Sequence, residues 1–205
     1  MATVRAYIGI GANVGDAAET LAAAIHALAG LPGTRLRGVS RLYVTRPVGV
    51  LDQPEFHNAV VALDVPAGPD PDAGATALLV ALKGLERAFG RQPRERWGPR
   101  EVDLDLLVFG RNRVDVDRPP EGRSDDPAKA SLPLTVPHRD AQGRLFVLAP
   151  LADLAPRLVP PGWGESVGSA AARRRREEGD DAVTPVATWD AGGWRPLAGR
   201  GGGTA

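Results

Sequence analysis

Apolar residues in the first third of the chain follow the periods of a strand and of a helix in turn. Residues 4–10 form an apolar run of β-favouring residues, and residues 16–30 are rich in alanine and leucine and close with glycine. This pattern predicts a strand, a glycine loop and a helix. Residues 35–45 and 56–65 again have strand patterns, and a turn-rich polar loop joins them. Because long loops often carry function, we expect that loop to matter for activity.

A second helix and a further strand follow the same logic. Leucines and a phenylalanine recur at helical spacing over residues 71–89, and Gly90 is suited to stop that helix. Residues 101–109 predict a strand, and residues 114–116 a short return strand. The resulting order is β-α-β-β-α-β. It predicts an α+β fold with a ferredoxin-like core, in which both helices pack on one face of an antiparallel sheet.

Two segments differ from this core in composition. Residues 117–131 contain almost no large apolar side chain, which predicts a mobile insertion. The core and this insertion are expected to form one domain over residues 1–164. Residues 165–205 predict a polar, partly disordered C-terminal extension, in which the arginine block at 173–176 is a solvated charge run. Two tryptophans within residues 183–194 leave open whether that part packs back as a strand.

Composition narrows the class of protein. The chain has 205 residues, 43% of them hydrophobic, and its formal net charge is zero, so any anion binding must come from local clusters of charge. It contains no cysteine, which excludes disulfides, thiol catalysis and cysteine-based zinc sites. No apolar run is long enough for a signal peptide or a membrane span. We therefore expect a cytoplasmic protein.

The richest chemistry lies in the stretch R-Q-P-R-E-R-W-G-P-R-E-V-D-L-D, which ends at Asp105. In a strand, Asp103 and Asp105 share one face while Val102 and Leu104 line the other. A divalent cation would relieve the repulsion between the two carboxylates, and Mg²⁺ suits such a pair. The four arginines just upstream match phosphate oxygens in geometry and charge. The alternative is a surface strand with salt-bridged carboxylates.

Aromatic and polar side chains elsewhere could hold a ring. Phe56 and Asn58 lie two apart at a strand start, so they share a face and could stack on and bond to a flat heterocycle. Downstream, His138 follows a proline and is the best functional candidate among three histidines, because the other two are expected to be structural or solvated. Arg144 and Phe146 could place a cation and a ring in the same cleft.

The first glycine loop carries less information. Gly9, Gly11 and Gly15 fit neither the dinucleotide fingerprint nor a P-loop. A tight turn between strand and helix explains them, with Asn13 as a turn former and Asp16 as the helix N-cap.

These segments, in this order, resemble the 6-hydroxymethyl-7,8-dihydropterin pyrophosphokinase family of folate biosynthesis. The resemblance covers roughly residues 4–160. It rests on Y-I-G-I-G-A-N-V-G-D, S-R-L-Y-V-T-R-P-V-G-V-L-D-Q-P-E-F-H-N-A-V, G-R-Q-P-R-E-R-W-G-P-R-E-V-D-L-D-L-L-V-F-G and L-T-V-P-H-R-D-A-Q-G-R-L-F-V-L-A-P-L.

The resemblance implies transfer of pyrophosphate from ATP to the pterin hydroxymethyl group, with two Mg²⁺ ions on a ferredoxin-like scaffold. The metal ligands would be Asp103 and Asp105, which with Arg91 and Arg100 form the catalytic set. The ATP site would comprise Glu86, Arg91, Arg96, Trp97, Arg100, His138 and Arg144, and the pterin site Thr45, Val48, Phe56, Asn58 and Phe146. We expect a monomer whose partners are ATP and the hydroxymethyl dihydropterin, without nucleic acid or membrane.

Two other functions stay open at this point. A ferredoxin-like module could have lost activity or could bind RNA on its sheet, although such sheets carry basic and aromatic strand motifs where this chain has two acids. A kinase of a different heterocycle would use the same phosphate chemistry. Magnesium-dependent release of AMP from ATP in the presence of the pterin separates these functions.

Overall fold

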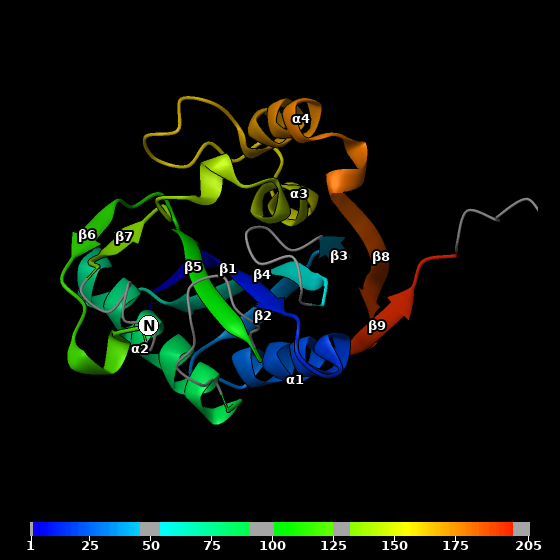
Figure 1. Ribbon diagram of the computed structural model, residues 1–205. Helices are drawn as coiled ribbons and strands as arrows, with labels where there is room; N and C mark the ends of the chain where they lie inside the picture. The colour runs from blue at the N-terminus through cyan, green and yellow to red at the C-terminus, as the bar shows by residue number, and fades with distance from the viewer. Residues whose placement is uncertain (1, 46–53, 91–100, 125–131, 199–205) are drawn as a thin grey trace, which may run out of the picture.

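A seven-stranded antiparallel sheet forms the centre of the molecule (Figure 1). The computed structural model describes residues 2–45, 54–90, 101–124 and 132–198. The strand order is β5-β1-β4-β3-β8-β9, with β2 also paired to β4, and β6 and β7 form a separate two-stranded sheet. The strands are β1 Thr3–Ala12, β2 Arg35–Val39, β3 Leu42–Thr45, β4 Phe56–Pro66, β5 Asp103–Phe109, β6 Val114–Val116, β7 Leu134–Val136, β8 Val183–Asp190 and β9 Gly193–Pro196. The α-helices are α1 Ala17–Ala29, α2 Pro71–Ala88, α3 Leu145–Leu154 and α4 Val167–Glu178.

Helices cover both faces of this sheet. Strand β1 alternates, so its residues Ala6, Ile8 and Ile10 point into a core shared with α1 and α2. Strand β4 is buried on both faces, and Val60 on its other side packs against α3 and α4. Figure 1 shows these two helix pairs on opposite sides of the sheet. The α+β class is confirmed, but the helices on the second face are not predicted by the sequence pattern.

Both long helices begin and end where the sequence predicts. Asp16 is the N-cap of α1, and its Oδ1 accepts a hydrogen bond from the backbone amide of Glu19 at 3.0 Å. Asp70 caps α2 in the same way, accepting from Ala73 at 2.8 Å. Gly90 follows α2 with φ +78°, a conformation that glycine adopts without strain.

The predicted strand over residues 35–45 is two strands in the structure. Strands β2 and β3 both pair with β4, and the chain steps between them at Ser40. The Ser40 hydroxyl accepts from the backbone amide of Val60 at 2.9 Å, so the side chain takes the place of a backbone partner at the break. Strand β6 forms as predicted but pairs with β7, which had no strand prediction. In the predicted insertion, residues 120–122 form a 3-10 helix, and residues 125–131 lie outside the described residues.

Beyond residue 164, where the sequence predicts a polar extension, the structure places helix α4 and the hairpin β8–β9. Strand β8 pairs with β3 and so extends the sheet. The rings of Trp189 and Trp194 meet edge-on at 5.0 Å, and Trp189 also lies 5.6 Å from the ring of His26 on α1. The pairing of β8 with β3 and the contact of Trp189 with His26 join residues far apart in sequence, which is why local pattern could not reveal them.

None of the helices in the described parts of the chain is long and apolar enough to cross a membrane.

Candidate active site

The candidate site begins as one row of residues across four neighbouring strands. Gly11 on β1 pairs with Asp103 on β5 and with Asn58 on β4, and Asn58 in turn pairs with Tyr43 on β3. Paired residues of antiparallel strands project from the same face of a sheet. The register therefore brings Asp103 and Asn58, which the sequence assigned to different substrates, to one face with only a glycine between them.

Asp105 lies on the same face one step along. It pairs with Gly9, and both carboxylate residues are half-buried, whereas Leu104 and Leu106 point into the core with α1 and α2. This is the alternation predicted for the strand. Two carboxylates on one face offer oxygen donors and leave most of a coordination shell for water and phosphate, so they fit Mg²⁺. Among the described residues, no group of three or more His, Cys, Asp or Glu side chains could hold a metal.

Gly9 and Gly11 lie inside β1, so reading them as part of a turn was wrong; of the three glycines, only Gly15 has a positive φ, at +60°. A Cβ at Gly11 would lie 3.0 Å from Asn58 Oδ1, closer than nearly all real Cβ contacts. Gly11 is thus needed for the close approach of the Asn58 side chain to β1.

A buried ion pair supports the carboxylates from the opposite face. Lys83 and Glu86 on α2 are 5% and 1% exposed, and Lys83 Nζ lies 2.7 Å from Glu86 Oε1. The same Glu86 oxygen accepts from the Leu104 amide at 2.7 Å, and Lys83 Nζ donates to the Leu104 carbonyl at 3.3 Å. Leu104 lies between the two aspartates, so the pair fixes the backbone of strand β5 at that point. The predicted contact of Glu86 with nucleotide stays a prediction.

Arg118 is a cation near Asp105 to which the sequence pattern assigned no role. Burial lowers the pKa of its guanidinium, while the nearby charge of Asp105 opposes that shift, and Arg139 and Glu86 also act on it. Its Nε is buried without a hydrogen-bond partner among the described residues. The sequence offers no sign of a role for Arg118, because this residue lies in the apolar-poor segment predicted to be an insertion.

Three predicted pterin residues come together on the same face. Asn58 Nδ2 donates to Thr45 Oγ1 at 3.0 Å, and Phe56 pairs directly with Thr45. Phe146, at the start of α3, packs on the buried cluster that contains Tyr43. His57 alternates to the opposite face, as predicted, and its burial lowers its pKa.

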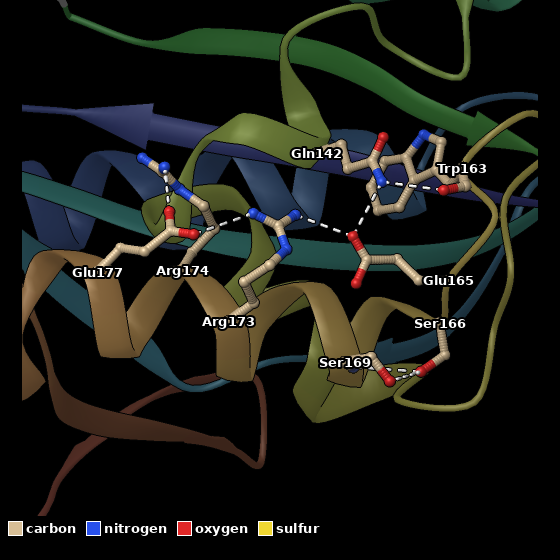
Figure 2. A network of polar contacts seen from close by, with 8 residues as sticks. All are labelled: Gln142, Trp163, Glu165, Ser166, Ser169, Arg173, Arg174 and Glu177. Carbon is tan, nitrogen blue, oxygen red and sulfur yellow. Dashed lines mark hydrogen bonds and ion pairs between the residues drawn. The ribbon is translucent and has the colours of Figure 1, made fainter.

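The turn between β7 and α3 carries the remaining candidates. The backbone amide of His138 donates to the Leu107 carbonyl at 2.9 Å, which ties the turn to the carboxylate strand β5. The Arg144 guanidinium reaches Asp140 Oδ2 at 2.6 Å and lies 5.8 Å from the Phe146 ring centroid, so a cation and a ring do share this region. Gln142 lies between His138 and Arg144 in sequence. It joins a polar network with residues of α4 and of the loop before that helix (Figure 2).

Five predicted site residues lie outside the described residues. They are Val48, Arg91, Arg96, Trp97 and Arg100. Their roles stay predictions, and the resemblance leaves open whether Arg94, also outside the described residues, or Arg96 contacts phosphate.

Comparison with known proteins identifies the family to which the chain is similar. Residues 7–156 match the model of the family described as 7,8-dihydro-6-hydroxymethylpterin-pyrophosphokinase (HPPK). A 2-amino-4-hydroxy-6-hydroxymethyldihydropteridine pyrophosphokinase of Pseudomonas aeruginosa is 43% identical over 157 residues, which are 77% of this chain and 84% of that protein. The enzyme of the same name from Methylorubrum extorquens is 40% identical over 169 residues, or 82% of this chain and 92% of that protein.

Solved structures show the same fold. Wild-type Plasmodium falciparum HPPK-DHPS with pteroate superposes with a TM-score of 0.69 at 15% identity, covering 96% of this chain and 48% of that one. An HPPK-DHPS in complex with substrates gives a TM-score of 0.70 at 13% identity, covering 96% of this chain and 50% of that one. This chain therefore spans about half the length of these solved structures.

The fold is of the α+β class, and a half-buried carboxylate pair lies on one face of its sheet. The chain belongs to the 7,8-dihydro-6-hydroxymethylpterin-pyrophosphokinase family.

Proposed function

We propose that the face carrying Asp103, Asp105 and Asn58 transfers pyrophosphate from ATP to the hydroxymethyl group of 6-hydroxymethyl-7,8-dihydropterin. The products are the pterin diphosphate and AMP, and the reaction serves folate synthesis. The observation that carries the proposal is the row Asp103, Gly11, Asn58. This row supports a site with two halves on one sheet, one for phosphate and one for the heterocycle. The two halves lie two strand spacings, or about 10 Å, apart.

The reaction requires mainly that the two substrates are aligned and that the charge of the polyphosphate is stabilised. The hydroxymethyl oxygen attacks the β-phosphorus, the bond from that phosphorus to the oxygen bridging to the α-phosphorus breaks, and the hydroxyl proton is lost. Little covalent help from the protein is needed, so holding the two substrates in line supplies most of the acceleration. Two Mg²⁺ ions held by Asp103 and Asp105 would, when bound, neutralise polyphosphate charge and make the hydroxyl more acidic.

Polar and charged side chains from several segments would hold the triphosphate. His138 and Arg144 flank the turn tied to β5, and Arg118 lies near Asp105, so all three support a phosphate site beside the carboxylates. Arg144 would exchange its bond to Asp140 for one to phosphate. By resemblance, Arg91, Arg96, Trp97 and Arg100 complete the ATP site, with Arg91 and Arg100 acting on the transferred group. Glu86, the other residue in that set, would act on the site through the backbone of Leu104.

The pterin would lie at the β3–β4 end of the face. Phe56 and Phe146 would stack on its two sides, and Asn58 with Thr45 would bond to its edge, together with backbone groups near Val48. The hydrogen bond from Asn58 to the buried Thr45 fixes the orientation of the amide, and therefore the direction of its carbonyl oxygen.

We also propose that the strands and helices of the core have a ferredoxin-like arrangement. Counting β2 and β3 as one broken strand, the order β5-β1-β4-β2/β3 with all neighbours antiparallel supports a split β-α-β unit followed by a second one. Strands β8 and β9 then extend the edge at β3. The proposed site residues on β3, β4 and β5 come from one sheet of a single chain, which supports a monomer.

The test is magnesium-dependent AMP release from ATP in the presence of the hydroxymethyl pterin. The proposal expects AMP and pterin diphosphate in equal amounts, with no AMP when either the pterin or Mg²⁺ is omitted. Well-folded protein that released no AMP would support an inactive or RNA-binding module. AMP release with another heterocycle at higher kcat/KM would support the alternative substrate.

A further inference from the structure

The C-terminal segment, residues 163–196, lies beyond the part of the chain that matches the family, yet it contacts both halves of the proposed site. The sequence assigned it no role. Two separate sets of contacts join it to the site, one through strand β8 and one through the loop before α4.

The first set reaches the pterin half. Val183, at the start of β8, pairs with Thr45 and is 2% exposed. It belongs to a small buried cluster with Tyr43, Leu145 and Ala149, on which Phe146 packs. Val183 therefore supports two residues proposed to hold the pterin: Thr45 through strand pairing and Phe146 through side-chain packing.

The second set reaches the ATP half and is the network in Figure 2. Glu165 Oε1 accepts from Arg173 at 2.8 Å and from Gln142 at 3.1 Å. These hydrogen bonds, from Arg173 first and then Gln142, hold the pKa of the Glu165 carboxyl below its usual value. Gln142 Nε2 also donates to the Trp163 carbonyl at 3.1 Å. Gln142 lies between His138 and Arg144, so Glu165 anchors the turn that carries both.

We infer that the C-terminal segment is a two-point positioning element, in which Val183 sets the pterin wall and Glu165 sets the nucleotide turn. The inference rests on the site assignments of the proposed function. Neither residue belongs to the proposed substrate-binding set. Each acts through a neighbour, and a displacement of about 1 Å in an aligning group can cost two orders of magnitude in rate. Val183 packs at the start of α3 and Glu165 bonds to the turn before that helix, so we expect each residue to affect chiefly its own substrate.

The chain offers matched control variants for both points. Val186 lies on the same strand as Val183 but packs on the cluster shared with α1, so Val186→Ala removes the same atoms away from the site. Glu177 pairs with Arg173 and Arg174 on α4 without touching Gln142, so Glu177→Gln is the matched control for Glu165→Gln.

The experiment measures KM for each substrate and the dissociation constant of the pterin in five variants, which are Val183→Ala, Val183→Ile, Glu165→Gln and the two controls. Val183→Ala should raise the pterin KM about threefold or more with the ATP KM unchanged, and Glu165→Gln should do the reverse. Val183→Ile should restore the pterin KM, and both controls should match the parent. Thermal unfolding checks that every variant is folded.

The inference is overturned if Val183→Ala and Glu165→Gln behave like their controls, or if each shifts both KM values alike. A parent protein that releases no AMP would instead refute the proposed function, so the two failures are distinguishable.

Discussion

Glu86 accepts a hydrogen bond from the Leu104 amide at 2.7 Å and so anchors the edge strand between the two aspartates from the far face of the sheet. Lys83 completes the anchor. Removing one partner of a buried ion pair leaves the other charge uncompensated, so Lys83→Met should lower the free energy of unfolding by about 3 kcal/mol. Urea denaturation measures this loss. In Lys83→Met/Glu86→Gln the loss should be smaller than the sum of the two single losses, and strict additivity would contradict the coupling.

The carboxylate pair predicts a loss of turnover that is not a loss of folding. Asp103→Asn and Asp105→Asn should each lower kcat by about 100-fold or more, with a milder effect on pterin binding, because the charge they stabilise develops during transfer. Steady-state AMP release measures kcat. Asp115→Asn, on the exposed side of β6, is the control and should match the parent. Near-parent rates in either site variant would contradict the metal assignment.

The two strand glycines predict a contrast. A Cβ at Gly11 would meet Asn58 Oδ1 at 3.0 Å and push the amide away, whereas one at Gly9 would meet the tip of Leu107 at an ordinary 3.4 Å. Gly11→Ala should therefore raise the pterin KM several-fold, and Gly9→Ala should leave it close to the parent value. Equal effects of the two substitutions on the pterin KM would show that Asn58 does not read the ring.

Arg118 predicts a nucleotide-specific effect. If its guanidinium contacts phosphate near Asp105, Arg118→Gln should raise the ATP KM about tenfold while the pterin dissociation constant stays unchanged. Arg113→Gln, on an exposed residue outside the site, serves as the control. An unchanged ATP KM in Arg118→Gln would remove Arg118 from the ATP site.

His57 predicts how stability depends on pH. Its burial puts the folded-state pKa below the unfolded value of about 6.5, so the unfolded chain binds the proton first and stability falls as the pH drops through that value. The loss ends once the pH is below the folded pKa. Urea midpoints between pH 7.5 and 5.5 should show this slope in the parent and a flatter one in His57→Gln. The hydrogen bond from Arg5 lowers the pKa of the Asp64 carboxyl. The stability that this carboxyl contributes is therefore lost in a more acidic window, below its usual pKa of 3.8.

Local pattern was sufficient for most of the core and for the carboxylate pair. The alternation of Asp103, Leu104 and Asp105 follows from the strand period alone, and the cap at Asp16 follows from side-chain chemistry. Partners across the sheet were beyond local pattern. The hydrogen bonds of Glu86 to Leu104 and of Asn58 to Thr45, and the nearness of Arg118 to Asp105, depend on register and packing.

Helix α3 shows a second reason for a missed prediction. The run L-F-V-L-A-P-L is apolar throughout and contains Pro150, so it gives no helical period, and Arg144 and Phe146 were related only by being two apart. The structure makes Arg144 the residue before the helix and Phe146 its second residue. Burial against β3 and β4, which no local window contains, selects the helix here.

The pairing of β8 with β3 has a consequence for synthesis of the chain. The partner of Thr45 is Val183, which lies 138 positions later in the chain. A nascent chain that has not yet emerged beyond β8 therefore exposes the backbone groups of β3 as a free edge. Free edges invite pairing with other chains. The wall proposed to hold the pterin is therefore among the last parts of the molecule to close, and the interval before it closes is when aggregation of the new chain is most favoured.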